Sequence, residues 1–376
     1  MTSYLEALRQ AAILFPIIAV AFTIPYIAFN YHKYGSILSL RAVIVYTFIL
    51  YLLCVYCLVI LPLPSPEAAA QLHGHKAQLV PFAFVGDILR NCDFQWSRPE
   101  TWLSVLGTSA FLTTAFNLLM TMPFGVYLRY YFQCRWFKTL ALSFLLSLFF
   151  EVTQLTGLYF LYPGSYRLFD VDDLMVNTLG GMIGYLLGGL AARFLPSRNE
   201  IDRASFVRGH QVSFLRRLVA LVYDAVAAAV LSGVLILALA ALSLPVHIAS
   251  AGLLAMVYFM FVPVLSRGQT MGHRLTRLRV VTAEGERSRW YQYILRYGSL
   301  FAVLYWLPWL LNLAIIFLRD QGILNDLTAL VAGGALVGGY LLFEAVRMAV
   351  HKPLFYERLS RTRVVSTIPP EDPDEP

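Results

Sequence analysis

The chain has 376 residues, of which 59% are hydrophobic and only 14% charged, whereas soluble domains are about 45–50% apolar and about 25% charged. A soluble fold of this length cannot bury so many apolar side chains, so the composition excludes a disordered chain, a coiled coil and a small secreted protein. The net charge of +7 does not indicate nucleic-acid binding, because the basic residues lie in loops between apolar runs, where they orient membrane helices. The composition predicts an all-α, polytopic membrane protein.

Apolar runs long enough to cross a bilayer, about 20 residues each, recur along the chain. They predict about nine transmembrane helices in two halves, at residues 11–31, 41–61, 104–128, 138–157, 173–194, 215–243, 246–266, 292–318 and 325–349. The third run contains Pro123 near its end, so buried neighbours must satisfy the backbone groups that this proline frees. The long loop at 62–103 is rich in aromatic and apolar side chains, which predicts that it lies along the outer membrane surface.

The distribution of basic residues predicts the orientation of these helices. Cytoplasmic loops carry an excess of Lys and Arg. With the N-terminus outside and the C-terminus in the cytoplasm, all but six of the 29 Lys and Arg residues lie inside. We expect four segments: a membrane domain at 1–195 with five helices, a cytoplasmic linker at 196–213, a membrane domain at 214–366 with four helices, and a disordered acidic tail at 367–376.

Charged side chains at membrane depth mark candidate sites, because each is costly unless it is paired or hydrated. Glu151 and Gln154 are three residues apart in the fourth run and share a face, and Asp173 and Asn177 are four apart in the fifth. A short loop between antiparallel helices would bring these side chains to a similar depth near the outer surface. The loop adds two aspartates and Arg167, the expected counter-charge, which predicts an outward-facing acidic pocket. Its candidate residues are Glu151, Gln154, Arg167, Asp170, Asp172, Asp173 and Asn177.

The same polar residues have a structural alternative as hydrogen-bonding glue between helices. For Gln154 or Asn177 alone this alternative is sufficient, but glue does not need the net negative charge that Glu151 and three aspartates would supply. Three glycines, Gly180, Gly184 and Gly188, follow at four-residue spacing and predict a close-packed helix face.

Several segments of the first half match the pattern of a known family. They are LVPF at 79–82, NLLMTMPFGVYL at 117–128, FEVTQLTG from residue 150 and YRLFDVDDLMVNTLGGMIGYLLG from residue 166. Over about residues 40–195 the chain resembles the VanZ-like family. The resemblance implies a protein of the bacterial plasma membrane, related to a founding member that confers resistance to the glycopeptide teicoplanin.

The second half contains acids and arginines near its expected inner ends. Arg217 and Asp224 are seven residues apart in the sixth run, two helical turns, so they share a face. The loop LRVVTAEGERS at 278–288 predicts a short hairpin that turns at Glu284-Gly285. Glu344 and Arg347 are three apart in the ninth run and are expected to neutralise one another.

This half resembles the RDD family over about residues 210–366. The matching segments are RRLVALVYD at 216–224, GQTMGHRLTRLRVV at 268–281, Arg296, and PLFYERLSRTRVV at 353–365. Glu357 stands where the family pattern has an aspartate, and His273 stands where it has a lysine. The resemblance implies a membrane domain that is sometimes proposed to act in transport, with a candidate inner site at Arg217, Asp224, Arg296 and Glu357.

Three hypotheses for function remain open. The acidic pocket binds a lipid-linked or cationic envelope component and alters the access of a glycopeptide antibiotic; or Glu151 and Asp224 are proton or cation stations of a transporter or ion-coupled exchanger; or the protein is an enzyme that modifies lipid headgroups. No nucleophile or metal-ligand set is complete and no P-loop, GxGxxG or GxSxG motif occurs, so the enzyme is the least favoured of the three hypotheses, and we expect no cofactor or metal. The expected partners are membrane lipids and a lipid-linked cell-wall component or glycopeptide, and no nucleic acid.

Overall fold

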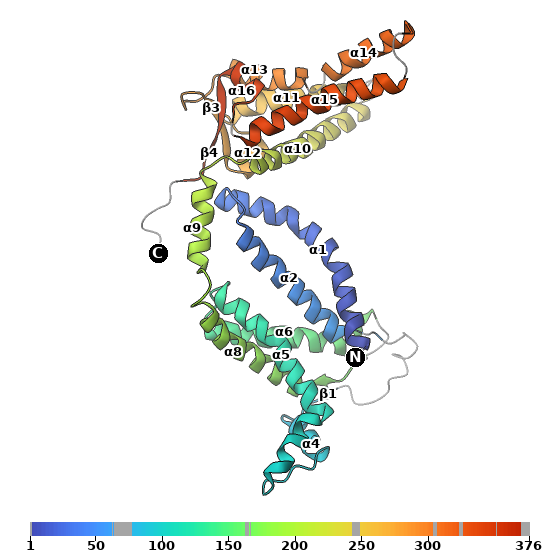
Figure 1. The fold of residues 1–376 in the computed structure, drawn as a ribbon, viewed down its shortest axis with the longest axis vertical. Coiled ribbons are helices and arrows are strands. Elements are labelled where there is room, and N and C mark those ends of the chain that lie inside the picture. Colours follow the sequence, from blue (N-terminus) through green and yellow to red (C-terminus); the bar gives the residue numbers. More distant parts are fainter. Residues whose placement is uncertain are drawn as a thin grey trace. The chain divides into compact units, whose positions relative to one another are not determined.

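The computed structural model describes residues 2–61, 63, 77–161, 165, 167–242, 249–303, 307–322, 326–350 and 352–369. The chain forms two compact units (Figure 1), one made of Met1–Ile24 and Leu38–Arg203 and the other of Pro25–Ile37 and Ala204–Pro376. This division differs from the boundary expected at residue 195, because the end of the first helix packs with the second unit. There Tyr34 is buried, and Arg277 Nε donates to the His32 carbonyl at 3.0 Å.

The first unit is helical apart from one short parallel strand pair. Its elements, which include the first part of α1 and the start of α9, are α1 (Thr2–Tyr34), α2 (Ser39–Ile60), β1 (Ala77–Gln78), α4 (Ala83–Arg90), η1 (Pro99–Gly107), α5 (Ser109–Tyr130), α6 (Trp136–Leu155), α7 (Gly157–Phe160), β2 (Phe169–Asp170), α8 (Val171–Ala191) and α9 (Arg198–Gly209). The linker expected at 196–213 therefore contains a helix.

The second unit contains helices and one antiparallel strand pair. Its elements are α10 (Phe214–Ala241), α11 (Ala249–Leu265), α12 (Met271–Leu275), β3 (Leu278–Thr282), α13 (Trp290–Phe301), α14 (Leu307–Asp320), α15 (Asp326–Ala349), α16 (Phe355–Ser360) and β4 (Thr362–Ser366). The single helix predicted at 292–318 is represented by α13 and α14, and residues 304–306 between them lie outside the described residues. The all-α fold class is confirmed.

Six helices in the described part of the chain are long and apolar enough to cross a membrane. They are Leu5–Tyr34, Ser39–Ile60, Ser109–Tyr130, Trp136–Leu155, Val171–Ala191 and Phe214–Ala241, and Leu254–Leu265 is a shorter apolar helix. A multi-pass membrane protein is thereby supported, whereas the expected count of about nine spans is not confirmed.

Helices α5, α6 and α8 pack side by side in the first unit (Figure 1). A Cβ atom on Gly184 would overlap the Met122 carbonyl of α5, and one on Gly125 would overlap the Gly181 carbonyl of α8. Only glycine permits this backbone approach, which is the usual use of small residues between membrane helices. The predicted close-packed glycine face of α8 therefore lies against α5.

Pro123 lacks the amide N–H that would donate to the Leu119 carbonyl within α5, and a tyrosine of α2 binds backbone groups beside this proline. The Tyr51 hydroxyl donates to the Met120 carbonyl at 2.8 Å and accepts from the Phe124 amide at 3.2 Å. In a regular helix these two backbone groups would bond to each other. Helix α2 thus supplies a polar partner next to Pro123, and the satisfaction of the Leu119 carbonyl that the proline frees stays a prediction.

The strand pair β3–β4 joins two distant segments of the second unit. Residues 278–282 pair antiparallel with 362–366. The expected turn at Glu284-Gly285 is present, since the Gly285 amide donates to Thr282 O at 3.0 Å and Val281 forms a bridge with Arg287, but the main partner of β3 is β4. The first residues of the tail expected to be disordered continue this fold, because the Thr367 amide donates to Arg277 O at 2.8 Å; residues 370–376 lie outside the described residues.

Candidate functional site

Four acids lie together where α6 ends and α8 begins, and we call Glu151, Asp170, Asp172 and Asp173 the carboxylate cluster. Glu151 belongs to a buried polar stripe on α6 that recurs every four residues and also contains Thr139, Ser143 and Ser147. Such spacing keeps the side chains on one helix face. The aspartates follow the strand β2 into the first turn of α8, where negative charge is favourable.

Hydrogen bonds connect the two helices along this stripe. Asn177 Nδ2 donates to Ser147 Oγ at 3.0 Å, and Ser147 Oγ donates to the Asp173 carbonyl at 3.3 Å. One turn further along α6, Glu151 Oε2 accepts the Asp170 amide at 2.9 Å. Glu151 and Asn177 therefore face the same α6–α8 interface, at neighbouring levels.

Neutral groups hold each acid of the carboxylate cluster. Asp170 caps α8 by accepting the Asp172 amide at 2.8 Å, and Asp172 accepts the amides of Phe82 at 2.6 Å and Phe84 at 2.9 Å. Asp173 Oδ1 accepts the side-chain amide of Asn117 at 2.7 Å. Throughout the described ranges, no Lys or Arg forms an ion pair with any of the four acids.

The position of Asp170 between the two helices affects its titration. Burial raises the pKa of this carboxyl; the hydrogen bond from the Asp172 amide opposes the change, and the carboxylates of Asp172 and Asp87 add to it. The negative charges of neighbouring carboxylates therefore contribute to the raised pKa of Asp170.

Gln154 and Arg167 have a different role from the one predicted. Gln154 Nε2 donates to the Val59 carbonyl at 2.9 Å, and Arg167 Nη1 donates to the same oxygen at 3.0 Å. Val59 lies in the last turn of α2, where carbonyl groups lack partners within the helix and carry partial negative charge. Arg167 thus binds the end of α2 rather than acting as a paired counter-charge, and Gln154 is hydrogen-bonding glue.

The prediction from sequence missed the donors to the acids. Asn117, Phe82 and Phe84 lie 50 or more residues before the aspartates that they bind, as the separations of 56, 90 and 88 residues show. Asn117 and Phe82 belong to the segments NLLMTMPFGVYL and LVPF, which carry the family resemblance. Those segments were the signal that could have placed them at the site.

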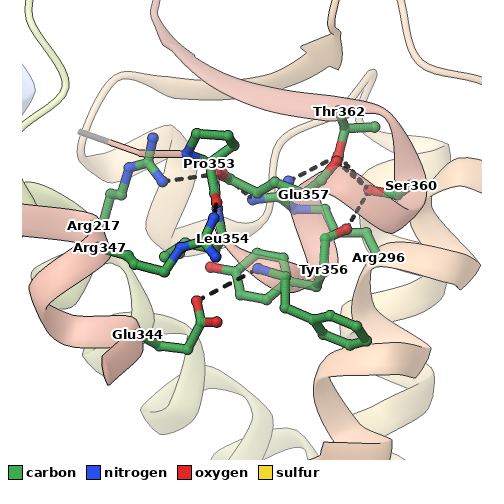
Figure 2. A network of polar contacts seen from close by, with 11 residues as sticks. Arg217, Arg296, Glu344, Arg347, Pro353, Leu354, Tyr356, Glu357, Ser360 and Thr362 are labelled. Carbon is green, nitrogen blue, oxygen red and sulfur yellow. Dashed lines mark hydrogen bonds and ion pairs between the residues drawn. The ribbon is translucent and has the colours of Figure 1, made fainter. Parts of the chain in front are cut away.

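A second polar network lies in the other unit, around Glu357 (Figure 2). Glu357 Oε1 lies 3.0 Å from Arg217 Nη1 and 3.2 Å from Arg296 Nη2, while its Oε2 accepts the Leu354 amide at 3.1 Å. Arg296 Nη1 also donates to Thr362 Oγ1 at 2.8 Å. Glu357 and Arg296 are each 3% exposed, so this acid is charge-compensated within the protein.

Asp224 does not join this network, although it was predicted to be part of the same inner site. It accepts hydrogen bonds from the Tyr258 hydroxyl at 2.8 Å, the Thr270 hydroxyl at 2.5 Å and the Gly272 amide at 2.7 Å. These neutral donors of α11 and of the start of α12 occupy both carboxylate oxygens. Asp224 therefore connects three helices, apart from the pair of arginines.

The expected neutralisation of Glu344 by Arg347 is also absent from the described residues. Glu344 accepts the Phe355 amide at 3.4 Å, and Arg347 donates to the Pro353 carbonyl, as Figure 2 shows for the labelled side chains.

His273 is affected by the two arginines of the Glu357 network. Burial and the charges of Arg296 and Arg217 lower the pKa of His273 to about 3. The imidazole is therefore neutral at physiological pH.

No group of three or more His, Cys, Asp or Glu in the described ranges is arranged to hold a metal ion.

Comparison with known families assigns a family to each half of the chain. Residues 48–192 match the VanZ/LLP1 family model, and residues 212–342 match the RDD family model. The chain joins a VanZ/LLP1 region to an RDD region. No curated protein and no solved structure matches it.

The two matches divide the site residues between them. The carboxylate cluster and its donors Phe82, Phe84 and Asn117 all lie within the VanZ/LLP1 region. In the RDD region, Arg217, Asp224 and Arg296 lie within the matched residues, whereas Glu357 follows their end. The segment after the match therefore completes the polar network through α16 and β4.

The RDD region also contains a buried arginine that the sequence analysis did not select. Arg216 is 0% exposed, and it donates to the carbonyls of Thr276 at 2.7 Å, Gly209 at 2.6 Å and Arg277 at 2.8 Å. The buried positions of α10 recur every four residues and include Arg216 and Asp224. Helical spacing alone allowed either arginine, and packing placed Arg216 in the interior.

Proposed function

We propose that this membrane protein modulates the interaction of the bacterial cell envelope with a glycopeptide antibiotic, through the carboxylate cluster of its VanZ/LLP1 region. The ligand would be a cationic group of a lipid-linked cell-wall component or of the glycopeptide itself. The observation that carries the proposal is that four neighbouring acids are held only by neutral donors. A cation bound there could form direct ion pairs with the acids, which no described Lys or Arg forms.

The proposal includes an orientation, with the N-terminus outside and the C-terminus in the cytoplasm. The bias of Lys and Arg toward the loops that this orientation places inside supports it. It requires the loop between α6 and α8 to face the outside. A cysteine introduced at Leu168, which is 43% exposed, should react with a membrane-impermeant maleimide in intact cells. Reaction only after lysis would mean that this loop faces the cytoplasm and that the orientation is the opposite of the one proposed.

The functional test is antibiotic susceptibility in a strain in which deletion of this gene changes the response to teicoplanin. Glu151→Gln and Asp173→Asn should each shift susceptibility toward that of the deletion strain. Asp320→Asn, which removes an exposed acid of α14 by the same chemistry, is the matched control and should behave as wild type. Equal susceptibility of wild type and both cluster variants, at equal amounts in the membrane, would exclude this function.

Ion exchange through Glu151 and Asp224 is a weaker proposal. Asp224 already accepts three hydrogen bonds from neutral donors, so a transported cation would have to compete with them. Proteoliposomes that show a flux dependent on both acids would favour exchange over the binding function.

A further inference from the structure

The segment before α5 exposes an unusual number of large apolar side chains. We call residues 79–107, which contain α4 and η1, the α4–η1 platform. Phe82 is 59% exposed, Trp96 82% and Leu103 74%, and Val85 and Leu89 are also exposed. In water a contiguous apolar surface made of such side chains would be an interaction site or a liability.

The side chains of α4 divide into three sectors around its axis. Phe82, at the N-cap, and Val85 and Leu89 are spaced three and four residues apart, so they share one helix face, and all three are exposed. On another side Arg90 is ion-paired with Asp87 at 3.2 Å, and both are exposed to solvent. Ile88 is buried. A helix with an apolar face, a charged face and a protein-facing flank is suited to a membrane surface.

Phe82 combines an exposed side chain with an unusual backbone conformation. This residue has φ of 65°, in the left-handed region that is unfavourable for a bulky side chain. Asp172 of the carboxylate cluster holds it there by accepting its amide at 2.6 Å. The same carboxylate accepts the Phe84 amide, so α4 is attached to the start of α8 while its apolar face points outward.

The exposed apolar surface continues into a membrane-spanning helix. Leu103 and Leu106 of η1 are followed by Leu112, Phe116 and Leu119 of α5, all exposed. Because α5 has the length and composition of a membrane span, those α5 side chains face lipid. Both η1 and α4 contact α5, and Figure 1 shows α4 beyond the end of α5, away from the packed bodies of α6 and α8.

We propose that the α4–η1 platform lies in the headgroup region of the same membrane that α5 spans, with Phe82, Val85 and Leu103 directed toward the acyl chains. The occupant of the apolar face is the phospholipid bilayer itself. Trp96 and Trp102 supply the amphipathic rings that favour this depth, and Asp87 and Arg90 remain on the aqueous side. The inference does not depend on the proposed function, since it requires neither antibiotic nor cation binding.

Site-directed spin labelling of the full chain in nanodiscs of phosphatidylglycerol and phosphatidylethanolamine tests the platform. Labels at Val85→Cys and Leu103→Cys should show several-fold higher accessibility to oxygen relative to a nickel chelate than a label at Arg90→Cys, the matched control on the charged side of α4. The background is Cys92→Ser, whose own labelling gives the contribution of the remaining cysteines. Equal access of the nickel chelate at all three sites would overturn the proposal.

Another result of the spin-label experiment would also overturn the proposal that the platform lies in the membrane. If both reagents were excluded at Val85 and Leu103, another protein surface, such as a second copy of this chain, would cover the platform instead of lipid.

Tryptophan quenching by phospholipid brominated in the upper acyl chain provides a measurement that needs no cysteine variants. Trp96→Phe and Trp102→Phe should each lower the quenchable fraction of the emission, and an unchanged fraction in both variants would contradict the bilayer as occupant.

Discussion

The two polar sites of this protein stabilise a buried acid in different ways. In the second unit, Glu357 lies between Arg217 and Arg296, so its charge is neutralised where it is buried. In the VanZ/LLP1 region, Glu151 and its neighbouring aspartates are held by backbone and side-chain amide groups, and the described residues supply no paired cation. Both acids are almost fully buried, at 3% and 2% exposed.

This difference separates a structural network from a candidate binding site. A buried ion pair that is already complete has little left to offer a ligand, and removal of one member leaves the other charge unpaired. A group of acids held by neutral donors keeps its net charge and can attract a cation. The comparison therefore favours a structural role for the Glu357 network and supports the carboxylate cluster as the site of the proposed ligand binding.

Substitution of Glu357 gives the largest expected difference between the two sites. Glu357→Gln leaves two arginines without their acid, and we expect a loss of about 3–5 kcal/mol in the free energy of unfolding. Glu151→Gln should cost about 1 kcal/mol or less, because its side-chain carbonyl can still accept the Asp170 amide. Thermal unfolding of the purified protein in one detergent measures both. Equal losses in the two variants would erase the distinction between the sites.

Asp172 tests whether the carboxylate cluster also has a structural member. Asp172→Asn keeps one acceptor but turns an amide NH₂ group toward a backbone N–H, so we expect a loss of about 1–3 kcal/mol. Hydrogen exchange at Phe82 and Phe84 should accelerate with it. Asp93→Asn, a change at an exposed residue of the same segment, should leave exchange unaltered; acceleration in both variants would mean that Asp172 is not the anchor.

Tyr51 offers a smaller test in the helices that support the cluster. Tyr51→Phe removes the hydroxyl that bridges Met120 and Phe124, and it should lower the free energy of unfolding by about 1 kcal/mol. The control is Tyr127→Phe, whose hydroxyl bonds to Thr47 at an exposed position and should matter little. Identical melting of both variants and wild type would show that α5 satisfies its own backbone at Pro123.

At neutral pH His273 gives the smallest expected effect, and its contribution grows as the pH is lowered. Its pKa is lowered to about 3 in the fold, against 6.5 for the free side chain, so below pH 6.5 the unfolded chain binds a proton that the folded one does not. The free energy of unfolding should therefore fall as the pH is lowered from 6.5 toward 3, by at most about 1.4 kcal/mol per pH unit. His273→Gln should lose less stability over this range. Parallel pH curves for the two proteins would contradict the assignment.

The fold class and the grouping of the acids could be predicted because they depend on local patterns. Apolar runs fix the membrane helices, and the spacing of Glu151 on α6 and Asn177 on α8, joined by a short loop, places both at one interface. The partners could not be predicted in the same way. Arg167 binds the end of α2 rather than an acid, and Asp224 has neutral donors instead of an arginine, because these contacts join residues far apart in the chain.

Hydropathy and short motifs are properties of contiguous residues, so they were sufficient to identify an apolar, helical membrane protein with a VanZ-like half and an RDD-like half. Only the tertiary structure decided which donors meet which acids, that β4 rather than a local hairpin strand completes β3, and that Arg216 rather than Arg217 is fully buried. The physical reason is that hydrogen bonds and burial depend on the geometry of packed helices, and helical spacing leaves several partners for each polar side chain equally possible until packing selects one.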